Sequence, residues 1–80
     1  MMMKCFGQVI ETYYYDDKPW ITIWDLEHGD QVAVRDRDIP GLKIGQLVSF
    51  ERKGENKLGN ILNVKKIAKD QLPSHLKPII

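Results

Sequence analysis

The chain has 80 residues, 42% of them hydrophobic and 29% charged, and a formal net charge of +1. These totals are ordinary for a soluble globular protein, and no stretch reaches the roughly 20 apolar residues of a membrane span, so we expect a cytoplasmic protein with no membrane partner. A chain this short buries only about 60% of its unfolded surface, which predicts one domain with a thin core. The single cysteine, Cys5, excludes an internal disulfide and is expected to be a buried small hydrophobe. With only His28 and His75 as nitrogen ligands, far apart in the sequence, we expect no metal site and no cofactor.

Charge is distributed unevenly along the chain. The first forty residues hold four basic and eight acidic side chains, net −4, and the last forty hold eight basic and three acidic, net +5. This asymmetry is compatible with a basic surface patch despite the nearly neutral total, and equally with a solvated surface of mixed sign.

The segment 4–15 is rich in β-forming residues and predicts one long strand that bends. Gly7 marks a position where a bulge or a close backbone approach would let the strand curl. The strand ends on three consecutive tyrosines, Tyr13 to Tyr15, and a polar turn follows at 16–19. Because neighbouring side chains of a strand point to opposite faces, at least one of the three rings must lie outside the core.

Two alternating runs, about 20–25 and 31–37, predict a β-hairpin whose turn contains Gly29. One face of this hairpin is apolar and is assigned to the core: Ile21, Ile23, Val32 and Val34. The opposite face carries two aromatic rings and a cation: Trp20, Thr22, Trp24, Ala33 and Arg35. The second face is the one whose composition calls for a functional explanation.

The rest of the chain predicts two more strands and a tail. Pro40, Gly41 and Gly45 exclude a long helix between 38 and 45. Strands are predicted at about 46–53 and 58–67 around a polar loop at 54–57. In the last strand Leu62 and Val64 share one face and Ile61 falls on the opposite, polar face, which requires a bulge or a covering element. Five short strands predict an all-β domain, a small OB-like barrel over 1–69, followed by an extended C-terminal tail over 70–80.

The segment 42–50 reads Leu-x-x-Gly-Gln-x-Val-x-Phe, and Asn63-Val64 lies near the end of the last strand. With the strands before them, these stretches resemble the cold-shock domain over roughly residues 6–67. The resemblance implies a five-stranded OB-fold barrel that binds single-stranded RNA or DNA.

The resemblance also places that family's two nucleic-acid motifs. Its Lys-Gly-aromatic-Gly-Phe-Ile motif falls on Lys18 to Ile23, where Trp20 keeps the aromatic ring and Thr22 replaces a phenylalanine. Its Val-Phe-Val-His motif falls on Val32 to Arg35, where both valines are kept and the outward phenylalanine and histidine are replaced. The scaffold therefore matches more fully than the binding motifs.

Aromatic rings that accept base stacking, beside cations that follow the backbone, are the physical requirement for binding single strands. One or more of the three tyrosines is expected to join such a platform with the two tryptophans. The predicted site is Trp20, Trp24, Arg35, Tyr13 and Tyr14, with Lys18, Arg37, Lys53 and Lys57 at its margins. Against it stand three acids that repel phosphate, Asp25, Asp36 and Asp38, and each tryptophan could instead cover an end of the core, under Tyr14 or the tail.

An enzyme and a protein-interaction module are the other classes of function that the sequence bears on. No phosphate-binding glycine loop or nucleophile motif occurs, and His28 is expected to be a solvated turn residue, so we expect no enzyme. The alternative is a protein-interaction module that docks through the aromatic face or the apolar tail. Self-association or a protein partner would then use residues 72–80, which contain Leu72, Leu76, Ile79 and Ile80.

Overall fold

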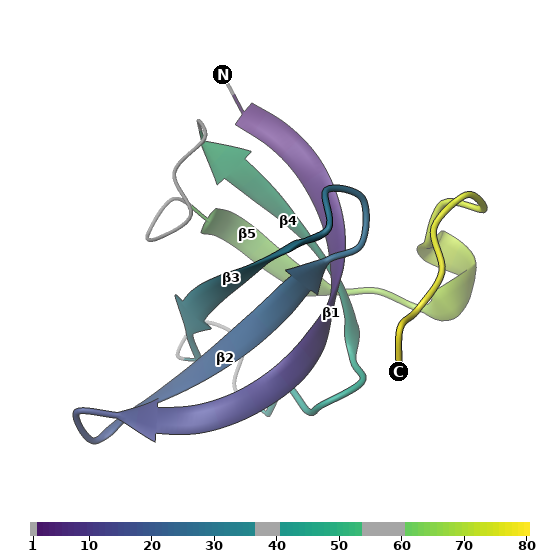
Figure 1. Cartoon of the computed structure of the whole chain (residues 1–80). Helices are drawn as coiled ribbons and strands as arrows, with labels where there is room; N and C mark the ends of the chain where they lie inside the picture. The colour runs from purple at the N-terminus through teal and green to yellow at the C-terminus, as the bar shows by residue number, and fades with distance from the viewer. Residues whose placement is uncertain (1, 37–40, 54–60) are drawn as a thin grey trace.

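Five antiparallel strands form one sheet in the computed structural model, which describes residues 2–36, 41–53 and 61–80 (Figure 1). The strands are β1 Met2–Tyr15, β2 Lys18–Asp25, β3 Asp30–Arg35, β4 Leu47–Lys53 and β5 Ile61–Lys66, and a 3₁₀ turn follows at Lys69–Gln71. The predicted all-β class is therefore confirmed. The predicted loop at 54–57, the first residues of the predicted fifth strand, and the predicted site residues Arg37 and Lys57 lie outside the described residues.

The long strand β1 lies at the centre of the order β3-β2-β1-β4-β5 and pairs with two neighbours along different parts of its length. Its first part pairs with β4, from Met2 opposite Lys53 to Gln8 opposite Leu47, and its later part pairs with β2 as far as Tyr15 opposite Lys18. A register shift between Val9 and Glu11 marks a bulge. The predicted bend is thus present, two residues beyond Gly7.

Gly7 itself lies where the neighbouring strands β2 and β4 approach β1 closely. A Cβ at this position would lie 2.5 Å from Ile23 Cγ2, 2.6 Å from the Trp24 carbonyl oxygen and 2.9 Å from Phe50 Cε1. The missing side chain therefore lets β2 and β4 both pack tightly against β1.

The core is formed by the inward side chains of four strands and one loop residue: Cys5, Val9, Ile21, Ile23, Val32, Leu42, Val48 and Phe50. The last strand adds to it through a bulge, because Asn63 has a φ of 55° and the β4–β5 register shifts beside it. Ile61 and Val64 consequently both pack against the core, whereas Leu62 is 46% exposed. The predicted pairing of Leu62 with Val64 on one face is wrong, and the predicted bulge is the reason.

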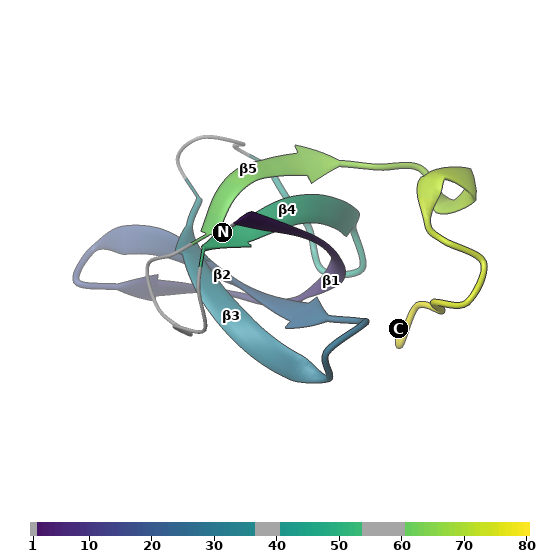
Figure 2. The same cartoon turned by 90° about the horizontal axis from the view of Figure 1, so that it is seen from above.

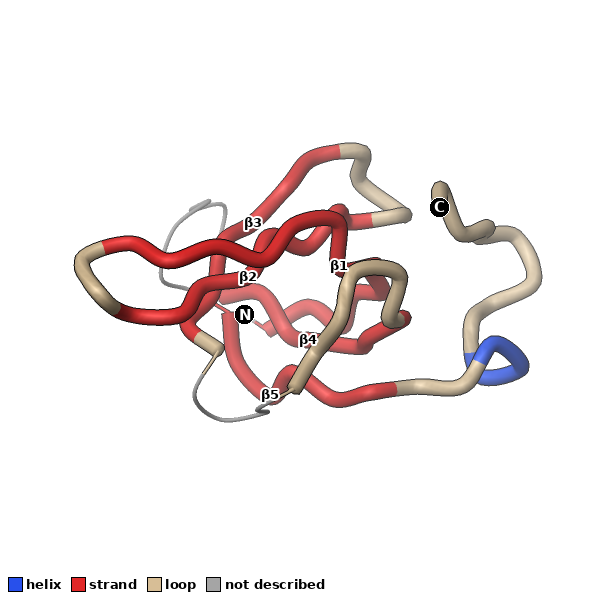
Figure 3. The backbone as a smooth tube through the Cα atoms, turned by 90° about the horizontal axis from the view of Figure 1, so that it is seen from below, coloured by secondary structure: helices blue, strands red, loops and turns tan. Residues whose placement is uncertain are grey.

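The sheet curls, and its two outermost strands are β3 and β5 (Figure 2). Within the described ranges no ladder of hydrogen bonds joins these two strands, yet residues of both line one cavity of about 390 Å³, among them Val34 and Val64. The chain after β5 leaves the sheet and lies to its side, with a 3₁₀ turn and a second turn closed by the Leu76 N–H donating to the Pro73 carbonyl (Figure 3). None of the described residues forms a helix long and apolar enough to cross a membrane.

Substitution of Gly7 tests this packing. We expect Gly7→Ala to lower the free energy of unfolding by about 1 to 3 kcal/mol, because the added methyl group overlaps Ile23 and main-chain atoms of β2. Urea denaturation measures the change. Thr12→Ala, on an exposed position of the same strand, is the matched control. Equal stability of the two variants would contradict the close approach at Gly7.

Candidate binding surface

The outward side chains of β2, of β3 and of β1 from Gln8 onward form one surface, here called the outer face. Paired residues of antiparallel strands point to the same side, so the register fixes its rows. One row joins Tyr13, Trp20 and Arg35, and the last row joins Gln8, Trp24 and Gln31. Between them lies the row Glu11, Thr22 and Ala33. The sequence-predicted residues Tyr13, Trp20, Trp24 and Arg35 therefore share one face, as expected.

The register changes the assignment of the tyrosines. Tyr15 is opposite Lys18 and has the same parity as Tyr13, so both rings belong to the outer face, while Tyr14 points to the other side of the strand. Tyr14 and Tyr15 are 79% and 68% exposed. Strand alternation could have separated Tyr14 from its neighbours, but only once the phase of the strand beyond the bulge was known.

The tip of the β1–β2 hairpin holds Tyr15 and Lys18 in this position. Asp16 and Asp17 both adopt a left-handed conformation, with φ of 54° and 59°. Two consecutive residues of this kind make the tight hairpin turn whose twist matches the strands, and aspartate accepts the conformation more readily than most residues. The turn therefore makes Tyr15 and Lys18 the last outward pair of the hairpin, one row beyond Tyr13 and Trp20.

Arg35 and Trp20 interact directly on the outer face. The Arg35 guanidinium carbon lies 5.8 Å from the centroid of the Trp20 ring, within the range of a cation–π contact. Three polar atoms near this row are buried without a hydrogen-bond partner among the described residues: Trp20 Nε1, Arg35 Nε and Asp36 Oδ1. An unpaired buried polar group costs about 1 to 3 kcal/mol of stability.

The charges on the outer face are few. Lys18 and Arg35 are its described cations, and Glu11 is its described anion, with its Oε1 accepting a 3.3 Å hydrogen bond from Thr22 Oγ1. Asp36 follows Arg35 and donates its N–H to the Pro19 carbonyl. Lys53, predicted at the margin of the site, lies opposite Met2, at the far end of β1 from the tyrosines (Figure 1).

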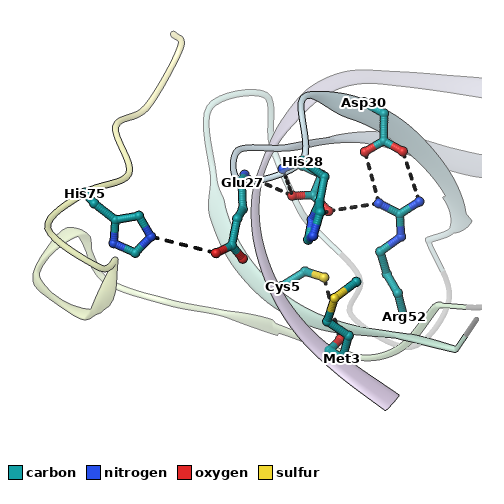
Figure 4. Close-up of polar contacts among 8 residues, drawn as sticks. Met3, Cys5, Glu27, His28, Asp30, Arg52 and His75 are labelled. Atoms are coloured by element: carbon teal, nitrogen blue, oxygen red, sulfur yellow. Dashed lines mark hydrogen bonds and ion pairs between the residues drawn. The ribbon is translucent and has the colours of Figure 1, made fainter. Parts of the chain in front are cut away.

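The acid that seemed in the sequence to oppose anion binding, Asp25, points into the protein. Its side chain is fully buried at the end of β2, where Asp30 is its cross-strand partner. Arg52 of β4 joins the two carboxylates: Nη1 donates to Asp25 Oδ2, and Nη1 and Nη2 donate to the two oxygens of Asp30, all at 3.0 Å (Figure 4). The prediction that Asp25 repels phosphate on this surface is therefore wrong.

His28 also belongs to this cluster rather than to solvent alone. Its main-chain N–H donates to Asp25 Oδ1 at 2.9 Å, and its Nδ1 lies 2.9 Å from Asp25 Oδ2. The side chain is 36% exposed. Hydrogen bonding to Asp30 raises the pKa of Arg52, against the effect of its burial, so Arg52 stays charged.

Cys5, Asp25 and His28 bring three potential metal ligands within 4.8 Å of one another, a proximity that their separation in the sequence concealed. The chemistry of the cluster favours a structural role. Asp25 already faces four groups, since Oδ1 also accepts the Glu27 N–H and Oδ2 faces both His28 and Arg52. Burial and then the charge of Asp25 raise the pKa of the Cys5 thiol to about 12, so it stays protonated, and an ion would have to displace the Arg52 guanidinium. Cys5 is completely buried, as predicted.

Comparison with known proteins adds no relative: no family model, no curated protein and no solved structure matches the chain.

The Arg52 cluster predicts a large effect on stability. We expect Arg52→Met to lower the free energy of unfolding by about 3 to 5 kcal/mol, because the fully buried Asp25 side chain loses its counterion. The neighbouring exposed residue gives a matched control, Lys53→Met, for which we expect a change within about 0.5 kcal/mol. Thermal and urea unfolding followed by circular dichroism measure both, and a loss that is the same in the two variants would refute the role of Arg52.

Proposed function

We propose that this chain is a non-catalytic single-stranded nucleic-acid-binding protein, and that the outer face is where RNA or DNA binds. The observation that carries the proposal is the row Tyr13, Trp20 and Arg35, which brings two rings and a guanidinium from three strands side by side. Trp24, further along the same face, supplies a third ring. Successive bases of a single strand stack on such rings, and this contact does not depend on base identity.

The proposal includes a small OB-like barrel as the scaffold. The strand order β3-β2-β1-β4-β5 is compatible with this fold, in which β1 serves both halves of the sheet and β3 approaches β5. The cavity lined by both outer strands supports that proximity. In OB-folds the binding surface lies around the second and third strands, which in this chain carry Trp20, Trp24 and Arg35.

Electrostatics limits the expected affinity. Two cations on the face, Lys18 and Arg35, correspond to about two phosphate contacts, and the carboxylate of Glu11 opposes a third nearby. For single strands each neutralised phosphate contributes about −0.7 to the slope of log K against log salt, so the slope expected here is about −1.4. Stacking rather than charge therefore supplies most of the proposed binding free energy.

A protein-interaction module is the second candidate, and the exposure of the tail favours it. Ile79 and Ile80 are 54% and 66% exposed, which is unusual for large apolar side chains unless a partner covers them. An apolar contact of this kind strengthens slightly or stays constant as salt rises, whereas the nucleic-acid contact weakens. Affinity measured over a range of salt concentrations thus separates the two candidates.

The tyrosines test the proposed site most sharply, because three identical side chains lie next to one another on alternating faces. We expect Tyr13→Ala and Tyr15→Ala each to weaken binding of a fluorescein-labelled dT12 by about 1 to 3 kcal/mol, the free energy of one stacked base. Fluorescence anisotropy gives the dissociation constants.

Tyr14→Ala is the matched control. Its ring points away from the outer face, so we expect the affinity to change by less than about 0.5 kcal/mol. Circular dichroism spectra and melting temperatures verify that all three variants remain folded. Equal losses in the three variants, or no binding of dT12 or U12 by the unsubstituted protein, would contradict the proposal.

A further inference from the structure

The C-terminal segment is attached to the sheet at Gln8. The Gln8 side chain is 3% exposed, and its Nε2 donates to the Gly45 carbonyl at 3.0 Å, which fixes the orientation of the amide. Its Oε1 accepts the main-chain N–H groups of Ile79 and Ile80, at 2.8 and 3.1 Å. Both ends of this buried amide on β1 are thus bonded, and the oxygen holds the end of the chain.

This attachment lies on the outer face. Gln8 is opposite Trp24 on one side and Leu47 on the other, so all three side chains point outward. Leu47 is nevertheless only 8% exposed, and Trp24 is half-buried. The end of the chain is therefore held beside the Trp24 end of the outer face, next to the buried Leu47.

A second contact lies just beyond Trp24. His75 Nε2 is 3.8 Å from Glu27 Oε2, in the turn that joins β2 to β3 (Figure 4). The tail therefore meets the sheet both at Gln8, beside Trp24, and at Glu27, three residues after it. The row Tyr13, Trp20 and Arg35 lies toward the other end of the hairpin.

We propose that residues 72–80 are an autoinhibitory segment that competes with nucleic acid for the Trp24 end of the outer face. The inference rests on the proposed function, and it divides the face into a part at Trp20, away from the tail, and a part at Trp24, beside the attachment of the tail. A strand that occupies both tryptophans must displace the tail from Gln8.

The attachment is suited to reversible release. It consists of two hydrogen bonds to a neutral amide and one 3.8 Å contact between the side chains of His75 and Glu27, which are 66% and 43% exposed. Bonds of this kind contribute little each, since water replaces them when they break. Loss of both N–H donors is expected to strengthen nucleic-acid binding by about three- to ten-fold.

The test removes the two donors and leaves the sheet intact. In the double variant Ile79→Pro/Ile80→Pro neither residue has an N–H to donate to Gln8. The matched control is Ile79→Ala/Ile80→Ala, which keeps both N–H groups and truncates both side chains. Affinity for labelled dT12 is measured by anisotropy on the full chain, and Trp24 and Trp20 indole N–H signals are followed by NMR without nucleic acid.

We expect the proline variant to shift the Trp24 signal, to leave the Trp20 signal in place and to bind dT12 three- to ten-fold more tightly, with the alanine variant close to the unsubstituted chain. Unchanged or weaker binding by the proline variant, with the Trp24 signal shifted, would overturn the autoinhibitory role and leave the proposed function standing. Absence of dT12 binding by every variant would overturn the proposed function, and the NMR signals would still report whether the tail covers Trp24.

Discussion

The arrangement depends on one constraint: β1 must pair with β4 along its first part and with β2 along its second. If β1 were straight, its hydrogen-bonded pairings with β2 and β4 would lie in one flat sheet with no enclosed core. Gly7 relieves the constraint because its missing side chain lets Ile23 of β2 and Phe50 of β4 both approach the strand, and the bulge that follows shifts the register of the pairing with β2. The curl of the sheet, the buried core inside it and the half-buried row of rings outside it all follow from that bend.

The same bend explains what the sequence could and could not predict. Strict alternation located the hairpin, the core residues Ile21 and Ile23, and the opposite face of Trp20 and Trp24, because a period of two is a local property. The register beyond a bulge depends on the partner strand and not on the local pattern. The sequence therefore predicts Tyr14 for the face on which Tyr13 and Tyr15 lie.

The buried charges mark the second limit of sequence reasoning. Asp25 continues the inward alternation of Ile21 and Ile23, and Arg52 continues that of Val48 and Phe50, so the pattern contained both positions. A charged residue at an inward position is usually interpreted as a strand end, and only the β1-centred pairing brings β2 and β4 close enough for one to neutralise the other. The sequence of either strand alone does not indicate that Arg52 of β4 neutralises Asp25 of β2.

Together these features describe a small domain with a thin core, in which the proposed binding residues lie on the outer face of the sheet. The Arg52 cluster closes one end of the β2–β3 hairpin with paired charges, and at the opposite end of the outer face Trp20 Nε1 and Arg35 Nε have no hydrogen-bond partner among the described residues. Paired charges stabilise the fold, whereas the half-buried row of Tyr13, Trp20 and Arg35 carries the proposed contacts to nucleic acid. The proposed division between scaffold and binding surface rests on that contrast.

The most direct measurement is tryptophan fluorescence in two single-tryptophan variants, Trp20→Phe and Trp24→Phe, titrated with oligo-dT and oligo-U at low and high salt. If bases stack on the outer face, the fluorescence of Trp20 is quenched to saturation, and raising the salt concentration shifts the titration to higher concentrations of oligonucleotide. A flat titration of Trp20, with emission already at the short wavelengths of a buried indole, would contradict nucleic-acid binding on this face.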